Sequence, residues 1–373
     1  MIRNFDNAAT TFPKPAAVKK AAIYAMEHYT SSGRGGHPLA AETSRAVYSA
    51  RVTAAEFFGA EPENTIFTMN CTHGLNIAIQ GIMRGGGHMI ISSMEHNSAA
   101  RPAAKLAAEK KISLSVAQVY PEDSRTIESF RSLIRSDTKA IVCTLASNVT
   151  GQLLPYREIA EICRRKNICF IADGAQACGI IDVKLDHGIN ILCTAGHKGL
   201  YGLTGTGLLI SDGKFPIPSL MQGGTGNNSQ SLIQPDLLPE SLESGTSGII
   251  GIMSLKAGIE FVSRIEIPRI YAHEDKICRS FISTLSRNDK IKIYRESPAN
   301  YVPIVSFNAD GVKSEVLAAE LAKQGYCLRA GFQCAALAHS SLGTNNGTVR
   351  FSPSIFSRES DAVMLANYIN KIL

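Results

Sequence analysis

Several features are missing from this sequence, and each absence excludes a class of protein. It contains no tryptophan, and none of its nine cysteines forms a CxxC pair. An odd number of cysteines without close pairs argues against a disulfide framework and a four-cysteine zinc site, and it favours a reducing compartment. No apolar run approaches the ~18 residues of a membrane span, and the opening MIRNFDNAATTFPKP lacks the apolar core of a signal peptide. We therefore expect a cytoplasmic protein that does not enter a membrane.

Charge is also modest. Charged residues make up 19% of the chain, and the net charge of +6 comes from basic residues that are scattered along it. This balance gives little reason to expect nucleic acid as a partner, and it favours anionic small molecules. The apolar fraction of 45% is typical of a globular protein, and 373 residues are enough for two domains.

Short apolar runs alternate with helical stretches over the first two thirds of the chain. The runs that we predict as strands are 65–68, 88–92, 113–119, 140–145, 168–172, 191–193 and 207–210. Such alternation predicts an α/β fold, with a mainly parallel sheet covered by helices on both faces. A long predicted helix near 250–262 is followed by mixed strands and helices. We therefore divide the chain into an N-terminal segment 1–14, a large domain 15–253 and a small domain 254–373.

Polar residues follow five of these predicted strands. They are the stretches Asn70–Gly74, Met94–Ser98, Ser147–Gly151, Asp173–Gln176 and Thr194–Gly199. Ligands of open α/β sheets bind at the carboxyl ends of the strands, so these stretches are expected to meet at one site. Thr72 opens a helix whose N-terminus could hold a phosphate, although an ordinary helix cap explains that residue equally well.

Lys198 and Asp173 together predict a cofactor. Each has a simple alternative role when it is taken alone, as a solvated surface lysine or as a structural cap. Lys198, however, lies in the glycine-rich loop GHKGLYGLTGTG, where backbone can approach a ligand closely. A lysine amine with a lowered pKa forms a Schiff base with an aldehyde, and an aspartate can hold a protonated pyridine nitrogen. Pyridoxal 5'-phosphate needs both groups, and His96 would stack on its ring.

The motifs MEHNS, SNVTG, DGAQ, GHKGLYG, ESGT and RAGFQCA resemble those of the cysteine desulfurases, in the class V aminotransferase group of fold-type I pyridoxal-phosphate enzymes. The resemblance extends from Asp6–Thr11 to Gly347–Phe351. It implies a large domain with a mainly parallel seven-stranded sheet, and a smaller α+β C-terminal domain that carries Cys334 and Arg350. It also implies a homodimer and a reaction in which L-cysteine becomes L-alanine. A sulfur-acceptor protein and a role in iron–sulfur cluster assembly belong to the same expectation.

The resemblance also assigns cofactor contacts. It implies that Lys198 holds the cofactor, that Asp173 pairs with the pyridine nitrogen and that Gln176 bonds the phenolic oxygen. His96 would stack on the ring and take part in proton transfer. The residues implied to bind the phosphate are Thr72, His73, His197 and, from the neighbouring subunit, Thr246.

The same resemblance assigns the substrate side of the site. Cys334 is implied to be the nucleophile that takes up the sulfur as a persulfide, and Arg329 would favour its thiolate form. The alternative is that Cys334 is one more small packing residue. Asn148 and Arg350 are implied to bind the substrate carboxylate, and His37 to line the substrate entrance, with a turn role for its glycine-rich loop as the alternative.

Two departures from the family pattern stand out. Ala195 occupies a position where the family usually has a serine or threonine that bonds the phosphate, and Thr194 lies one residue earlier. The segment between Cys334 and Arg350 is short, as in the group-II branch, and it also resembles selenocysteine lyases. L-selenocysteine is therefore an alternative substrate, and a class V aminotransferase acting on another small amino acid or a non-catalytic scaffold are alternative functions.

Metal binding is not expected, because His28, His187 and His273 have no partner at the spacing of a metal site. His339 follows Cys334 by five positions, and we interpret it as lining the same site, with a Cys/His metal pair as the alternative.

Overall fold

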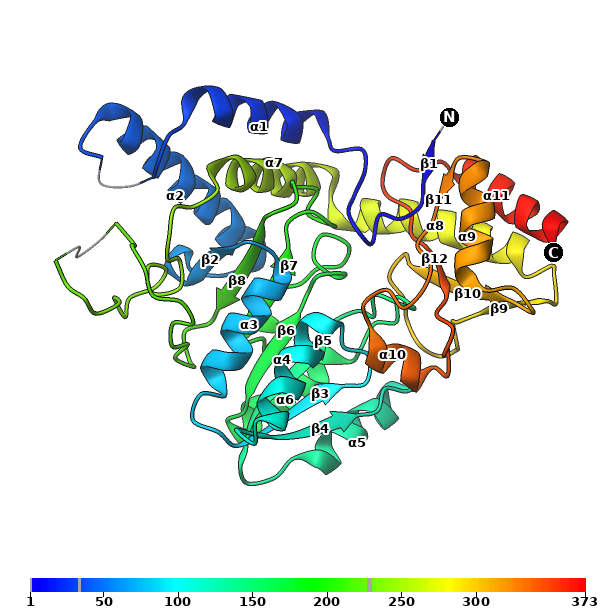
Figure 1. The fold of residues 1–373 in the computed structure, drawn as a ribbon, viewed down its shortest axis with the longest axis horizontal. Helices are drawn as coiled ribbons and strands as arrows, with labels where there is room; N and C mark the ends of the chain where they lie inside the picture. Colours follow the sequence, from blue (N-terminus) through cyan, green and yellow to red (C-terminus); the bar gives the residue numbers. More distant parts are fainter. Residues whose placement is uncertain (1, 33–34, 227–229) are drawn as a thin grey trace.

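The computed structural model describes residues 2–32, 35–226 and 230–373, and its centre is a seven-stranded sheet (Figure 1). In spatial order the strands are β2 (Thr65–Thr68), β8 (Gly207–Ser211), β7 (Ile191–Ala195), β6 (Cys169–Asp173), β5 (Thr138–Thr144), β3 (His88–Ser92) and β4 (Ser113–Ala117). β8 runs antiparallel to both of its neighbours, while the pairs from β7 to β4 are parallel. The predicted strands are thus confirmed, with ends that differ by at most two residues.

Helices cover both faces of this sheet, because its central strands are apolar on both sides. Along β5, Ile141 and Cys143 enter one buried cluster, while Ala140 and Val142 enter the other. This alternation is the two-residue period of a strand. The cluster of Ala140 includes side chains of α3 (Cys71–Ile82) and α4 (Asn97–Ala108). The opposite cluster includes side chains of α2 (Pro38–Phe58), α5 (Asp123–Leu133), α6 (Tyr156–Lys166) and α7 (Ile249–Ile265).

The C-terminal part of the chain has a core of its own, to the right in Figure 1. A three-stranded antiparallel sheet has the order β12 (Val349–Phe351), β10 (Val305–Ala309) and β9 (Ile291–Ile293). Its helices are α8 (Ile267–Leu285), α9 (Ser314–Lys323), α10 (Ala336–Ser341) and α11 (Glu359–Ile372). The N-terminal segment joins this part, because β1 (Arg3–Asn4) pairs with β11 (Tyr326–Cys327) and Phe5 lies in the same core.

The proposed boundary between residues 253 and 254 falls inside α7. This helix packs alongside α1 (Ala16–His28) and contributes Leu255 and Ile259 to the core under the large sheet (Figure 1). The next helix, α8, starts after Glu266, whose φ of 76° turns the backbone. The division into domains stays a prediction.

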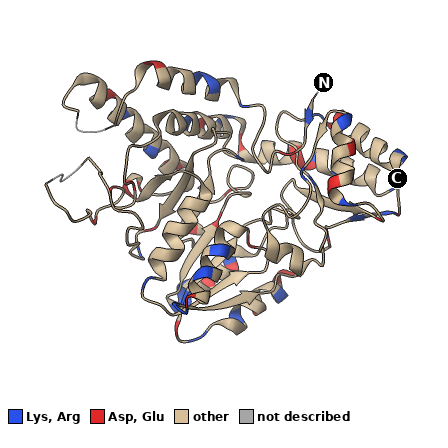
Figure 2. Ribbon diagram, in the orientation of Figure 1, with Lys and Arg blue, Asp and Glu red and all other residues tan. Residues whose placement is uncertain are grey.

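Basic and acidic residues are interspersed over both parts of the molecule (Figure 2). Among the described residues, no helix combines the length and the hydropathy needed to cross a membrane. In the same residues, no three His, Cys, Asp or Glu side chains gather in a way that could hold a metal ion.

Candidate active site

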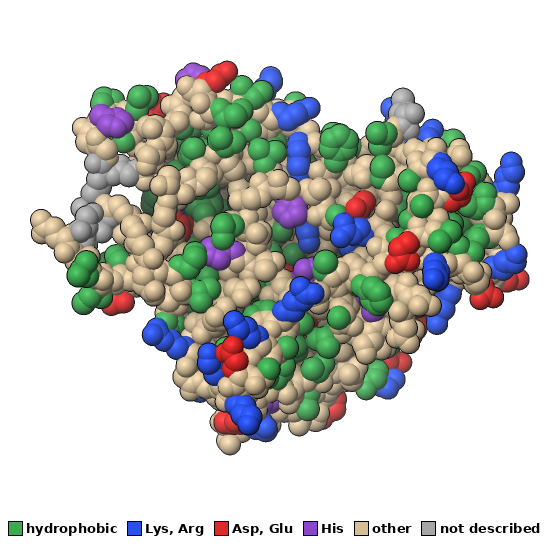
Figure 3. All heavy atoms as spheres, viewed as in Figure 1, with side chains coloured by type: hydrophobic (Ala, Val, Ile, Leu, Met, Phe, Trp, Pro, Cys, Tyr) green, Lys and Arg blue, Asp and Glu red, His purple; other side chains and the backbone are tan. Residues whose placement is uncertain are grey.

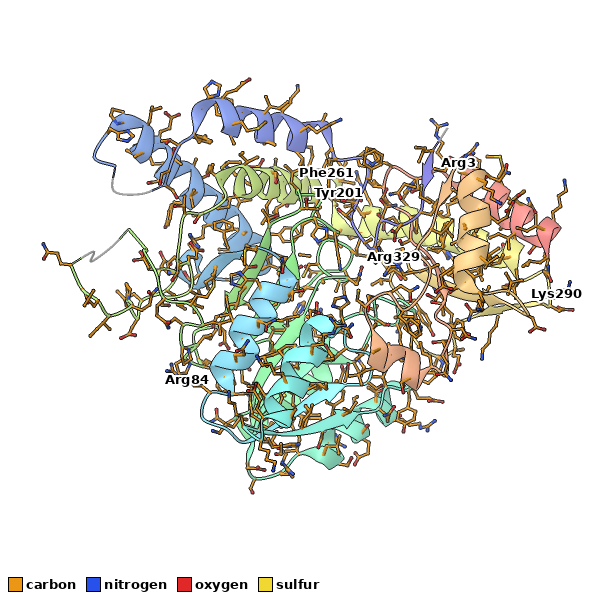
Figure 4. The ribbon with its side chains drawn as sticks, viewed as in Figure 1. Arg3, Arg84, Tyr201, Phe261, Lys290 and Arg329 are labelled. Carbon is orange, nitrogen blue, oxygen red and sulfur yellow. The ribbon has the colours of Figure 1, made fainter. Side chains whose placement is uncertain are left out.

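The carboxyl ends of the parallel strands face the small sheet across a cavity of ≈ 360 Å³. Figure 3 shows histidine and basic side chains near the middle of the face of the molecule that it draws. Figure 4 places Arg329 between the large and the small part of the molecule. The cavity is lined by ten of the residues singled out in the sequence: Thr72, His96, Asn148, Asp173, Gln176, His197, Lys198, Arg329, Cys334 and Arg350. The expected meeting of the strand ends at one site is therefore observed.

Lys198 and Asp173 are brought together at the ends of neighbouring strands. Lys198 follows β7, and Asp173 is the last residue of β6. Burial lowers the pKa of the Lys198 amine because desolvation disfavours its charged form, and the Asp173 carboxylate opposes this shift. A larger share of Lys198 is thus neutral and nucleophilic than of an ordinary lysine.

Asp173 is held by three donors from different elements. Its Oδ1 accepts from the backbone N–H of Ala175 at 2.9 Å and from the Cys71 thiol at 3.4 Å. Its Oδ2 lies 3.5 Å from the Ser98 hydroxyl. Cys71 and Ser98 were not among the predicted site residues. Both lie within the polar stretches that follow the predicted strands. Their spacing in the sequence does not indicate a contact with Asp173, which follows them by 75 or more residues.

His96 caps the helix α4 with its imidazole. Its Nδ1 accepts from the backbone N–H of Ser98 at 3.0 Å. Burial lowers the pKa of His96 because it disfavours the imidazolium ion. The neutral ring therefore carries its proton on Nε2, and that is the atom left for proton transfer.

Two buried histidine nitrogens near α3 are unpaired, one in the main cavity and one beside a neighbouring cavity. His197 Nδ1 and His73 Nε2 are buried and have no hydrogen-bond partner among the described residues. Burial lowers the pKa of His197 to about 4, and the cations Lys198 and Lys14 add to the shift. His73 lines a neighbouring cavity of ≈ 180 Å³ together with Thr246, rather than the main one.

Ala195 lines the main cavity and offers no hydroxyl there. The hydroxyl of Thr194 does not replace it, because it donates to the carbonyl oxygen of Gly174 at 3.4 Å. Polar groups at the end of the cavity near α3 include Thr72, at the start of that helix, and the unpaired Nδ1 of His197.

The C-terminal part of the chain brings cationic groups and a thiol to the opposite wall. Arg350, on β12, is 3% exposed and donates from Nη1 to the Asn148 carbonyl oxygen at 2.8 Å and from Nη2 to Asp6 at 3.0 Å. Its Nε and the Asn148 Oδ1 have no partner in the described part of the chain. A buried guanidinium with an unused N–H is suited to bind a carboxylate.

Cys334 differs from the other cysteines. Seven of the nine are buried and Cys327 is half-buried, whereas Cys334 is exposed. It lines the same cavity as Lys198 and Arg350. The exposed thiol can thus meet a small molecule held by that lysine and arginine.

Besides His73 and Thr246, two predicted positions lie outside the main cavity. His37 is the N-cap of α2, where its Nδ1 accepts from the backbone N–H of Ala40 at 3.3 Å, and it does not line the main cavity. Residues 33 and 34 of the preceding glycine-rich loop lie outside the described residues. His339 is 2% exposed and lies behind the cavity wall, where it bonds the side chain of Gln333.

Comparison with known proteins identifies the family. The model for class-V aminotransferases matches residues 3–365. This chain belongs to the class-V aminotransferase family. A probable cysteine desulfurase of Methanothermobacter thermautotrophicus is 29% identical, over 98% of this chain and 94% of the relative. A probable cysteine desulfurase of Pyrococcus abyssi is 27% identical, over 95% of this chain and 90% of the relative.

Solved structures agree with this placement. The apo structure of the cysteine desulfurase from Thermococcus onnurineus NA1 has a TM-score of 0.92 and 26% identity, covering 100% of this chain and 94% of that one. A cysteine desulfurase from Escherichia coli has a TM-score of 0.89 at 22% identity, covering 99% and 94%, and it supports the fold alone. The predicted fold class, that of fold-type I enzymes, is confirmed.

Proposed function

We propose that this class-V family member is a pyridoxal-phosphate-dependent cysteine desulfurase that converts L-cysteine to L-alanine. The observation that carries the proposal is the single cavity in which the exposed Cys334 faces the buried pair of Lys198 and Asp173. The names of the relatives and of the structural neighbours support the same activity.

The residues present fit the cofactor. The lowered pKa of Lys198 suits an amine that must attack an aldehyde, and the Asp173 carboxylate suits a protonated pyridine nitrogen. The unpaired Nδ1 of His197, with Thr72 at the start of α3, suits a phosphate in the main cavity, while His73 Nε2 lies beside the neighbouring cavity. When bound, pyridoxal phosphate supplies an electron sink for the substrate carbon atoms.

The chain's own residues would then orient the substrate and move its atoms. Arg350, through its unused Nε–H, would hold the L-cysteine carboxylate. Asn148 would add the second hydrogen of its Nδ2, whose other hydrogen bonds the Gln333 carbonyl oxygen. Lys198 and His96 Nε2 would hold and move protons at the substrate carbons. The Cys334 thiolate would attack the substrate sulfur, so that the carbon–sulfur bond breaks while a sulfur–sulfur bond forms. The electron pair of the broken bond leaves with carbon, which takes up a proton and becomes the methyl group of alanine.

We extend the proposal to a homodimer with shared sites. Large apolar side chains of the segment near the ESGT motif are exposed, among them Leu232 and Leu237, and so are Ile23 and Met26 of α1. An interface between two subunits would bury such side chains. Thr246 lies near this segment and would reach the phosphate of the neighbouring subunit. Light scattering gives the test, since a monomer at micromolar concentration would contradict the shared site.

We further propose that the enzyme works in the cytoplasm. There the sulfur held on Cys334 would pass to an acceptor protein, with iron–sulfur cluster assembly as one use. An acceptor thiol that gains sulfur from the wild-type enzyme but not from Cys334→Ala would support this step.

The activity is tested with the purified holoenzyme and L-cysteine in the presence of dithiothreitol. Alanine and sulfide should form in equal amounts, Cys334→Ala should release no sulfide, and the half-buried Cys327→Ala serves as the control. Absence of both products from the wild type would refute the proposal. Selenide release from L-selenocysteine that survives Cys334→Ala would instead assign a selenocysteine lyase, and amino transfer to a keto acid would assign an aminotransferase.

A further inference from the structure

Cys334 and the residue before it adopt an unusual backbone conformation. Gln333 has a φ of 40° and Cys334 a φ of 56°, although neither is a glycine. Left-handed backbone is unfavourable for residues with a Cβ, and it persists where the surrounding structure enforces it. Two such residues in succession, at the exposed thiol of the cavity, indicate that this conformation is held in place.

The side chain of Gln333 supplies part of that restraint. It is 5% exposed, and its Nε2 donates to the Thr348 carbonyl oxygen at 2.7 Å. A carbonyl oxygen only accepts, so this bond fixes the orientation of the amide and directs Oε1 to His339 Nε2 at 2.8 Å. His339 must therefore donate from Nε2, and its Nδ1 pairs with the hydroxyl of Thr344 at 2.7 Å.

The backbone of the same two residues is bonded to the large domain. The Gln333 carbonyl oxygen accepts from Asn148 Nδ2 at 2.7 Å, and the Cys334 carbonyl oxygen accepts from the Asn97 N–H at 2.8 Å. Asn97 is the neighbour of His96, and Asn148 also contacts Arg350. The thiol, the carboxylate-binding arginine and the cavity histidine therefore belong to one hydrogen-bonded frame.

We propose that Gln333 is a positioning residue, which His339 and Thr348 lock in place so that the Cys334 thiol is preset toward the substrate sulfur. The inference rests on the proposed function for the role of Cys334. We call Gln333, His339 and Thr348 together the lock. Phe332 packs against it, since its ring contacts the His339 ring edge-on with the ring centres 5.2 Å apart. The lock acts on the sulfur-transfer step and leaves the binding of L-cysteine to the other groups of the cavity.

The test compares Gln333→Leu, which removes the hydrogen bonds of the side-chain amide at similar size, with the exposed control Gln324→Leu. Misplacing a reacting group by an ångström costs roughly 10- to 100-fold in rate, so kcat for sulfide release should fall by that factor in Gln333→Leu. KM for L-cysteine and the absorbance change of the bound cofactor on addition of L-cysteine should stay within about two-fold of the wild type. The control should match the wild type in all three.

Gln333→Glu supplies a rescue that depends on pH. A protonated glutamate can accept from His339 and donate to the Thr348 carbonyl as the amide does, whereas the carboxylate cannot donate. Burial raises the pKa of a carboxyl group. The kcat of this variant relative to the wild type should thus rise as pH falls from about 8 to about 5.5, while the ratio for Gln333→Leu should stay constant.

Hydrogen–deuterium exchange provides a readout that does not depend on sulfur chemistry. The N–H groups of Ala335 and Thr348 bond to the Phe332 and Gly331 carbonyl oxygens at 2.9 and 3.0 Å, respectively. In Gln333→Leu holoenzyme they should exchange at least ~10-fold faster, with β6 unchanged.

Unchanged exchange, or a kcat for Gln333→Leu within two-fold of the wild type, would overturn the positioning role. Loss of L-cysteine binding together with kcat would overturn it as well. A wild type that releases no sulfide refutes the proposed function separately, and the exchange comparison still decides whether the lock exists.

Discussion

Cys71 donates its thiol hydrogen to Asp173 Oδ1 across 3.4 Å, in the cavity where Lys198 and Cys334 also lie. The site thus contains two cysteines with opposite properties. Burial raises the pKa of Cys71 well above that of an ordinary thiol, and the Asp173 carboxylate adds to the shift, so Cys71 remains a neutral donor. Cys334, in contrast, is exposed.

Thiol reagents should distinguish these two cysteines. Because the thiolate is the reactive form, Cys334 should be the first cysteine that iodoacetamide modifies at pH 7.5 in the native protein, and Cys71 should react at least ~100-fold more slowly. Peptide mass spectrometry over time measures both rates. Cys334→Ala should remove the fast phase, and fast labelling of Cys71 in that variant would contradict the structure.

Asp173→Asn should abolish most of the activity. The carboxylate opposes the desolvation that lowers the pKa of Lys198, so its removal should lower that pKa further. We expect turnover of L-cysteine to fall at least ~100-fold, because an amide cannot pair as an anion with a protonated ring nitrogen. Steady-state sulfide assays measure the loss, and the exposed Asp182→Asn is the matched control. Wild-type turnover in Asp173→Asn would rule out this role.

Glu95 should make stability depend on pH. Its side chain is buried, with Oε1 accepting from Ser92 Oγ at 2.5 Å and from the Thr144 N–H at 2.6 Å. Burial raises the pKa of Glu95 from 4.5 to about 8, so between these values the folded state binds a proton that the unfolded state lacks. Its contribution to stability is therefore complete below about pH 4.5 and is lost as pH rises toward about 8.

Glu95→Gln should remove that part of the pH dependence, because an amide does not titrate. Urea denaturation at pH 5.5 and at pH 8 should show a smaller loss of unfolding free energy in the variant than in the wild type. Glu274 is also buried, and burial raises its pKa to about 8, so some pH dependence should remain. Equal losses in both proteins would show that Glu95 does not titrate in this range.

The ion pair of Arg51 and Glu243 should matter for stability. The guanidinium donates to both carboxylate oxygens, at 2.6 and 2.8 Å, and the side chains are only 8% and 11% exposed. Glu243→Gln leaves a nearly buried charge without its partner, which should cost about 3–5 kcal/mol of unfolding free energy. Arg164→Ala, which breaks an exposed pair with Glu161, should cost at most ~1 kcal/mol. Similar costs for the two variants would contradict this difference.

The central strands were predictable because strands buried on both faces are near-continuous apolar runs, and such burial leaves few other choices. The ends of the strands were harder to predict than their positions. The prediction for 191–193 missed Thr194 and Ala195, which still pair with β8. The antiparallel direction of β8 also escaped the sequence pattern, because direction depends on the path of the connecting segment.

The order of the motifs determined the family, the cavity and most of its lining, since polar residues after successive parallel strands must meet at one edge of the sheet. Only the tertiary structure decided which of them touch. It alone joined Cys71 and Ser98 to Asp173, and Gln333 to His339 and Thr348. Such contacts depend on the directions of the side chains and on how the small sheet packs against the large domain. Neither can be predicted from the spacing of residues in the sequence. The exposure that separates Cys334 from the buried cysteines was decided in the same way.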